Sequence, residues 1–184
     1  MLVILSGVAG AGKDTIKNKL VEKNNNYTTL PSYTSRSPRA TDIPNVTYNF
    51  VTKDQFEEMI KNNELYEYSL HHNNYYGTSK KLLQEKLSEG KVIIKDIDVN
   101  GTEDLVNLLK NDVKILTIFL RVSKEELLNR LENREDHLPQ EEIKMRLNRL
   151  EYEESKMSLY DYVIENTDLD ETIIKIEEII SKNK

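Results

Sequence analysis

The sequence contains no cysteine among its 184 residues, which excludes disulfide bridges and thiolate metal sites. It also has no apolar run close to the roughly 20 residues that a membrane-spanning helix needs. The first ten residues, MLVILSGVAG, lack the basic stretch that opens a secretory signal, and we expect a first strand there. These absences predict a cytoplasmic protein that does not enter a membrane.

Positive charge is also scarce, since 32 acidic residues face 26 basic ones and the net charge is −6. A general nucleic-acid binder needs a basic face that displaces phosphate counterions, so we expect no nucleic-acid partner. Charged residues make up 32% of the chain and hydrophobic residues 38%. Those values indicate one folded domain rather than a disordered chain.

Arginine is restricted to two windows, whereas lysine is scattered along the chain. The arginines are Arg36 and Arg39, then Arg121, Arg130, Arg134, Arg146 and Arg149. Because the guanidinium group offers a planar fork of donors to phosphate or carboxylate, the windows predict two places that hold planar anions. Ordinary salt bridges on helix surfaces are the alternative, and we expect them for Arg149 and Arg121.

Short apolar runs alternate with stretches of helical periodicity. The expected strands are Leu2–Leu5, Val92–Ile94, Ile115–Phe119 and Tyr162–Ile164, and the expected helices are Lys13–Lys23, Gly101–Lys110, Lys124–Arg134 and Asp170–Ser181. Continuous apolar strands are typical of a parallel sheet covered on both faces. The alternation therefore predicts an α/β fold with a three-layer core.

Two segments interrupt this alternation. Residues 28–77 are rich in turns, hold one expected helix (Lys53–Asn62) and predict a small mixed β insertion. The polar segment Asn133–Gln140 lies between two arginine-bearing helices, as mobile lids of α/β enzymes often do.

A phosphate-binding loop is the strongest local motif. The segment Ser6–Thr15 follows the first strand and opens a helix, and Gly7, Gly12 and Lys13 match the fixed positions of G-x-x-x-x-G-K-[ST]. Glycines permit a tight turn whose backbone N–H groups point at phosphate oxygens, and the helix adds its positive end. A glycine-rich turn without a ligand is the less favoured alternative.

Asp14 departs from this pattern, because it stands where Ser or Thr is expected and the hydroxyl follows one residue later at Thr15. One interpretation is a carboxylate favoured in the first turn of a helix. The other is a contact to Mg²⁺, since an acid beside a triphosphate is tolerable when a metal ion lies close by.

Further motifs resemble those of the guanylate kinase family. They are Ser32–Arg39, Tyr48–Phe50, Glu64–Tyr68, Asn74–Thr78 and Asp96–Asp98, and the similarity runs from Met1 to about Ile180. The resemblance implies a P-loop kinase core (1–31, 79–125 and 158–184), a GMP-binding insertion (32–78) and a helical lid (126–157). It implies phosphorylation of GMP, and also dGMP, by ATP with Mg²⁺, in a monomer or a homodimer.

The resemblance also implies a role for each matching residue. The GMP-binding residues are Ser32, Arg36, Arg39, Tyr48, Glu67, Tyr76, Thr78 and Asp98. The ATP-binding residues are Gly7, Val8, Ala9, Gly10, Ala11, Gly12, Lys13, Asp14, Thr15 and Asn166. The catalytic residues are Lys13, Arg36, Arg130, Arg134 and Arg146, and the metal-binding residues are Asp14, Thr15 and Asp96.

The chemistry of guanine favours the same assignment. Its N1–H and its amino group are adjacent donors that a carboxylate such as Glu67 can accept, and a hydroxyl can donate to O6. Adenine lacks that pair of donors and would leave Glu67 unpaired.

Two other functions stay open from the sequence. A scaffold module of this fold would bind phosphopeptides, but such relatives typically lack the loop lysine and lid arginines that Lys13, Arg134 and Arg146 provide. The second open function is a related kinase that phosphorylates another acceptor, such as a non-guanine nucleoside monophosphate. His71 and His72 have no metal-ligand partners at suitable spacing, and we expect both to be surface residues in a polar turn.

Overall fold

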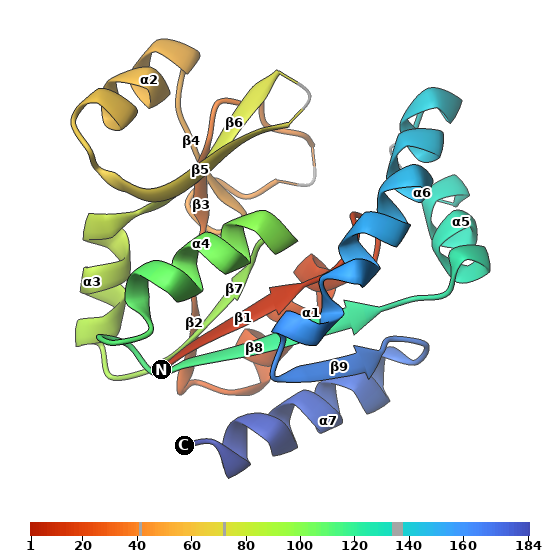
Figure 1. The fold of residues 1–184 in the computed structure, drawn as a ribbon. Helices are drawn as coiled ribbons and strands as arrows, with labels where there is room; N and C mark the ends of the chain where they lie inside the picture. The colour runs from red at the N-terminus through yellow and green to blue at the C-terminus, as the bar shows by residue number, and fades with distance from the viewer. Residues whose placement is uncertain (41, 72, 134–137) are drawn as a thin grey trace.

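The computed structural model describes residues 1–40, 42–71, 73–133 and 138–184. Five strands form the larger sheet, in the order β2-β7-β1-β8-β9 (Figure 1). They are β1 (Leu2–Ser6), β2 (Tyr27–Thr29), β7 (Val92–Asp96), β8 (Ile115–Arg121) and β9 (Tyr162–Glu165). Every neighbouring pair is parallel, so the predicted parallel sheet is confirmed.

Helices cover both faces of this sheet, which explains why β1 is buried throughout. Val3 and Leu5 pack with α1 (Lys13–Lys23) and α7 (Leu169–Lys182). Leu2 and Ile4 point to the other face and pack with α3 (Lys80–Ser88) and α4 (Val99–Leu109). The result is the expected three-layer core.

The part of the chain that follows β2 and precedes α3 forms a smaller mixed sheet with the strand order β4-β3-β6-β5. Its elements are β3 (Ser32–Thr34), β4 (Tyr48–Phe50), α2 (Lys53–Lys61), β5 (Leu65–His71) and β6 (Asn74–Ser79). β3 runs parallel to β4 but antiparallel to β6, and β5 and β6 form a hairpin. The predicted mixed β insertion is therefore confirmed.

Two further helices, α5 (Lys124–Glu132) and α6 (Gln140–Ser155), pack on the phosphate-binding loop, and the short 3₁₀ helix η1 (Met157–Leu159) follows α6. Val8 and Ala11 of the loop are buried in one cluster with Leu127, Leu131 and Ile143. Because of this packing, α5 and α6 stand beside the loop, across from the smaller sheet (Figure 1).

α1 has the expected bounds, whereas several ends of the other helices differ from the expected ones by one or two residues. α4 begins at Val99 rather than Gly101, because the Asp98 side chain caps it by accepting from the backbone N–H groups of Asn100 and Gly101. α5 ends at Glu132, with Asn133 as its C-cap, and not at Arg134. Arg134 itself lies outside the described residues.

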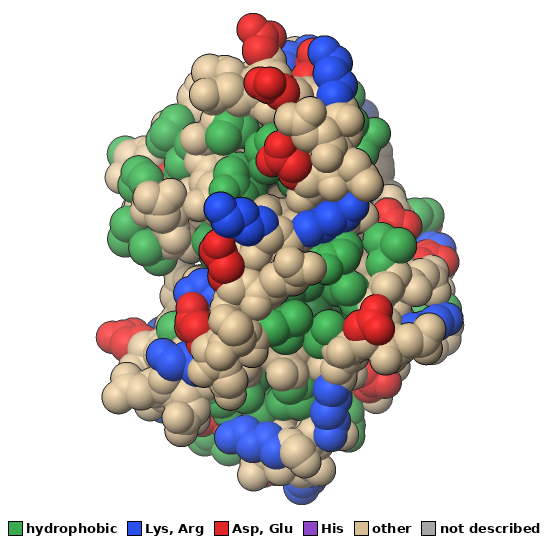
Figure 2. Space-filling view, turned by 90° about the vertical axis from the view of Figure 1, so that its left-hand side faces the viewer, with side chains coloured by type: hydrophobic (Ala, Val, Ile, Leu, Met, Phe, Trp, Pro, Cys, Tyr) green, Lys and Arg blue, Asp and Glu red, His purple; other side chains and the backbone are tan. Residues whose placement is uncertain are grey.

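No helix among the described residues is long and apolar enough to cross a membrane. On the face that carries α2 and α3, Lys and Arg side chains are interspersed with Asp and Glu side chains (Figure 2).

Candidate active site

A cleft of about 860 Å³ lies at the carboxyl ends of β1 and β7. Its lining comes from the phosphate-binding loop, the smaller sheet, the segment Asp96–Asp98 and the helices α5 and α6. Open α/β sheets bind ligands at the carboxyl ends of their strands. The cleft is therefore the candidate site.

The phosphate-binding loop presents backbone donors to this cleft. Gly12 is the N-cap of α1 with φ 91°, and no side chain caps the helix. The N–H groups of the first turn therefore stay available for an anion. Gly7 has φ 134°, and a Cβ there would lie 2.4 Å from the carbonyl oxygen of Leu120, so only glycine fits the turn.

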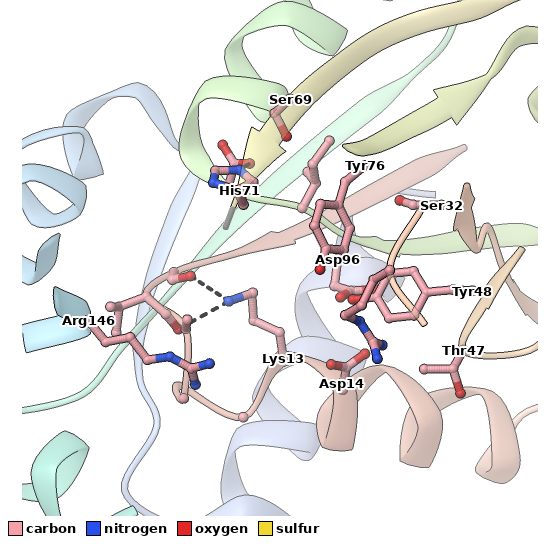
Figure 3. A pocket seen from close by; sticks show the side chains of 18 of the residues that line it. Lys13, Asp14, Ser32, Thr47, Tyr48, Ser69, His71, Tyr76, Asp96 and Arg146 are labelled. Atoms are coloured by element: carbon pink, nitrogen blue, oxygen red, sulfur yellow. Dashed lines mark hydrogen bonds and ion pairs between the residues drawn. The ribbon is translucent and has the colours of Figure 1, made fainter. Parts of the chain in front are cut away.

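Lys13 is folded back over the loop. Its Nζ donates to the carbonyl oxygens of Gly7 at 2.6 Å and Val8 at 3.1 Å, as the dashed lines in Figure 3 show. The ammonium group therefore lies above the ring of backbone donors, where a phosphate chain would add negative charge.

Asp14 belongs to a charged triad with Lys17 and Asp96. The Lys17 Nζ lies 2.8 Å from Oδ1 of Asp14 and 2.6 Å from Oδ1 of Asp96. Burial favours the neutral form of the Asp96 carboxyl, but Lys17, together with Lys95 and Lys13, outweighs burial and lowers the pKa of Asp96 to about 2. The charge of Asp96 in turn raises the pKa of Asp14.

The oxygen donors Asp14, Thr15 and Asp96 all line the cleft. Two carboxylates and a hydroxyl suit Mg²⁺, which usually takes one or two protein carboxylates and completes its octahedron with phosphate oxygens and water. No group of three or more His, Cys, Asp or Glu residues able to hold a metal occurs in the described part of the chain. The donor set therefore fits a metal ion that arrives with a nucleotide.

Arginine and tyrosine side chains form the opposite wall. The Arg36 guanidinium lies 5.3 Å from the centre of the Tyr48 ring and pairs with Asp42 at 2.9 Å. The Tyr48 and Tyr76 rings meet edge to face at 5.8 Å. Arg39 lines the same cleft. Cations and phenols converge here, which suits a phosphate dianion.

Glu67 lines the cleft on the side of the smaller sheet and is buried. Burial raises the pKa of Glu67, although Lys95 and the Thr78 hydroxyl, which donates to Oε1, oppose that rise. Thr78 is itself buried behind Glu67 and does not line the cleft. The fully buried Lys95 donates to Oγ of Ser32 at 2.8 Å and so fixes a second polar group of the site.

His71 is not the turn residue that we expected. It is the last residue of strand β5 and lines the cleft. Its Nε2 atom is 3.0 Å from Oδ2 of Asp98. The expectation of a surface position was wrong because the β5–β6 hairpin turns back only after His71. His72 lies outside the described residues. Burial disfavours ionised Asp98, yet the hydrogen bond from His71 helps to lower the pKa of Asp98 to about 2.

The second arginine window reaches the cleft through Arg130, Arg146 and Arg149. Arg130 donates to the carbonyl oxygens of Ala11 at 3.3 Å and Asn166 at 2.6 Å, and therefore braces the loop. Arg146 pairs with Glu142 one turn earlier on α6.

Arg149 was expected on a helix surface. It does make a salt bridge within its helix, at 2.9 Å to Glu153, but the partner carboxylate is buried and both residues line the cleft. Arg121 makes the expected salt bridges, with Glu154 and Glu165.

Asn166 is buried and does not line the cleft. Its Nδ2 donates to the Ala11 carbonyl oxygen at 2.6 Å, and its Oδ1 accepts from the Thr172 hydroxyl at 3.0 Å. The side chain therefore holds the phosphate-binding loop in place. Ala11, which belongs to the loop, is likewise buried.

Among the described residues around the cleft, sequence reasoning did not assign these ionisable side chains to the site: Lys17, Asp42, His71, Lys95, Arg149 and Glu153. Spacing along a helix could have indicated two pairs, Asp14 with Lys17 and Arg149 with Glu153. A lysine inside the apolar run of β7 was a signal for Lys95, because a buried charge requires a partner. Nothing local indicated the contact between His71 and Asp98.

Comparisons with known proteins point to one family. The guanylate kinase family model matches residues 1–183. The guanylate kinase of Rickettsia felis is 37% identical over 181 residues, which cover 98% of this chain and 92% of that protein. The guanylate kinase of Mycoplasmoides gallisepticum is 38% identical over 184 residues, 99% of this chain and 92% of that protein.

A crystal structure of guanylate kinase from Anaplasma phagocytophilum has a TM-score of 0.78 at 28% identity and covers 99% of this chain and 84% of that one. A family match along almost the whole length, together with relatives above 30% identity, leaves one assignment. This chain is an enzyme of the guanylate kinase family, with the fold of a P-loop kinase.

Proposed function

We propose that this enzyme transfers the γ-phosphoryl group of ATP to GMP, and also to dGMP, and releases ADP and GDP or dGDP. The observation that carries the proposal is that one cleft holds two different halves. One half presents glycine-loop donors and Lys13. The other presents two arginines, two tyrosines and the Glu67 carboxylate.

Base recognition falls to the floor of the acceptor half. Glu67 has Oε1 occupied by the Thr78 hydroxyl, and its carboxylate can accept from the N1–H and amino group of guanine. An adenine base would leave this buried carboxylate without a donor, which is a large penalty. Ser32 and Asp98 complete the proposed contacts around the base, whereas Thr78, which was expected to touch the base, donates its hydroxyl to Glu67 and supports that carboxylate.

Phosphate binding falls to Arg36, Arg39, Tyr48 and Tyr76. Their donors suit a dianionic phosphate and would aim one of its oxygens at the donor half. A bond then forms between that oxygen and the γ-phosphorus while the bond to the ADP oxygen breaks. Positioning and electrostatic stabilisation suffice for this reaction, so no covalent intermediate with the protein is needed.

Cations on the donor side would stabilise the charge that spreads over the transferring group. Lys13, Arg146 and Arg130 line the cleft from that side, and Arg134 stays a proposal that lies outside the described residues. Bound with ATP, Mg²⁺ would be held by Asp14, Thr15 and Asp96 and would neutralise phosphate charge. We also propose that the insertion 32–78 and the lid 126–157 close over the substrates and exclude water.

A coupled assay of ADP release against a panel of nucleoside monophosphates tests the proposal. We expect turnover with GMP and dGMP, and rates lower by about 10³-fold or more with AMP, CMP and UMP. Equal rates with AMP and GMP would contradict the base assignment. Turnover with none of the panel would contradict the proposed reaction.

A further inference from the structure

The contact between His71 and Asp98 connects the smaller sheet to helix α4 in the acceptor half of the cleft. His71 comes from the last position of β5, and Asp98 is the residue that caps α4. Both side chains are mostly buried, with 27% and 23% of their surface exposed. A carboxylate can only accept, so Nε2 of His71 carries the hydrogen and donates to Oδ2.

The Asp98 carboxylate is held from both sides. Its Oδ1 accepts from the backbone N–H groups of Asn100 at 2.8 Å and Gly101 at 3.2 Å, while Oδ2 accepts from His71 at 3.0 Å. A carboxylate has about four acceptor positions. Among the residues that the structure describes, three of these positions are filled, and the fourth, on Oδ2, is available to a ligand in the cleft.

The imidazole ring is itself held in place. Its centre lies 6.0 Å from that of the Tyr76 ring, and the two rings are tilted by 55°. Figure 3 shows His71 and Tyr76 on the same side of the cleft as Ser69. Because side chains alternate along a strand, Glu67, Ser69 and His71 face the cleft, while Tyr68 and Leu70 are exposed on the other face.

We propose that His71 is a positioning residue that turns the Asp98 carboxylate so that its remaining acceptor site meets the exocyclic amino group of the acceptor purine. The inference rests on the proposed GMP kinase function. Guanine carries two amino hydrogens, of which Glu67 can take one, and Asp98 then takes the other. Hypoxanthine, the base of IMP, keeps N1–H and O6 but lacks the amino group, so IMP cannot use Asp98.

The test measures dissociation constants of GMP and IMP by calorimetry or competition, together with kcat and the KM for ATP. For His71→Ala we expect GMP affinity to fall about tenfold, the size of one hydrogen bond to a charged group. Affinity for IMP, the KM for ATP and kcat at saturating GMP should each change by less than about threefold.

His71→Gln should restore most of the GMP affinity, because its terminal amide can donate near the position of Nε2. Leu70→Ala is the matched control on the same strand, since its side chain points away from the cleft and should leave the ratio of GMP to IMP affinity unchanged. Should His71→Ala fail to fold, His71→Asn gives the same test, because its shorter amide does not reach Oδ2.

A double-mutant cycle with Asp98→Asn separates positioning from general damage, since asparagine still caps a helix. In the Asp98→Asn background, the His71→Ala change should cost less than about twofold in GMP affinity. Equal losses for GMP and IMP, or a full tenfold loss without Asp98, would overturn the inference. A wild-type protein that does not phosphorylate GMP, or that binds IMP as tightly as GMP, would instead contradict the proposed function.

Discussion

The two halves of the cleft are built in different ways. The donor half is centred on one contiguous stretch, the phosphate-binding loop and the start of α1, where backbone N–H groups are the main donors, and α5 and α6 add Arg130 and Arg146. The acceptor half comes from four strands, a loop and the N-terminus of α4, and its donors and acceptors are side chains. The main groups of the donor half are therefore close together in the sequence, whereas those of the acceptor half are brought together by the order of the strands.

The same difference appears in part in the polar contacts of each half. Asp14, which replaces the usual Ser or Thr of the loop, meets Lys17 one helical turn later, although Lys17 also reaches Asp96 across 79 positions. In the acceptor half, Ser32 meets Lys95 across 63 positions, and Asp98 meets His71 across 27. A change in the donor half should therefore disturb transfer, whereas a change in the acceptor half should disturb the choice of base.

The largest effect should come from Lys13→Met. Removing the ammonium group above the loop should lower kcat by about 10³-fold, because charge stabilisation is lost at the transferring phosphoryl group. The KM for GMP should stay within about twofold, since the acceptor half is untouched. Steady-state kinetics with both substrates varied measures this, and preserved turnover would remove Lys13 from the proposed machinery.

Next should come Lys17→Met, which tests stability rather than catalysis. The side chain of Lys17 is 3% exposed between two carboxylates, and its loss leaves Asp96 buried without its ion-pair partner. We expect the free energy of unfolding to fall by about 3 kcal/mol. Urea unfolding measures it, with the exposed Lys19→Met on the same helix as control. A fall no larger than that of the control would show that the triad does not support the fold.

Glu67→Gln should act on the acceptor half alone. Glutamine keeps the volume and an oxygen for the Thr78 hydroxyl, but it replaces an acceptor with an amide donor toward the base. GMP affinity should fall roughly 30-fold, while the KM for ATP stays within about twofold. Dissociation constants for both nucleotides provide the readout, and equal losses for the two would count against base reading by Glu67.

The smallest effect should come from Asp14→Ser, which restores the usual hydroxyl. The Asp14 side chain is 56% exposed, so the variant should lose less than about 1 kcal/mol of stability. If Asp14 helps to hold Mg²⁺, the magnesium concentration for half-maximal turnover should shift several-fold. An unchanged titration would leave Asp14 as a carboxylate in the first turn of α1.

The element pattern was predictable because it is local. The four expected strands and the helices expected over Lys13–Lys23 and Lys124–Arg134 follow from apolar periodicity along single elements, although the second helix ends at Glu132. Ends were displaced by one or two residues where a side chain decided the cap, as Asp98 does for α4.

The membership of the site was predictable only in part. The resemblance to the guanylate kinase family placed Arg36, Glu67 and Asp98 in one site, and all three line the cleft. The same resemblance assigned Asn166 to the nucleotide, whereas its side chain is occupied with Ala11 and Thr172. A resemblance in sequence names the residue but not the direction of its side chain.

By itself, the sequence determined the parallel core and the phosphate-binding loop, and its resemblance to a known family named many of the side chains that line the cleft. The core and the loop depend on near neighbours, on periodicity along one element and on glycine at a few strained positions. Only the tertiary structure decided which cation supports which carboxylate, as Lys17 does for Asp96 and His71 for Asp98. The physical reason is that strand order and hairpin register bring distant residues to within about 3 Å, where hydrogen bonds and charges act.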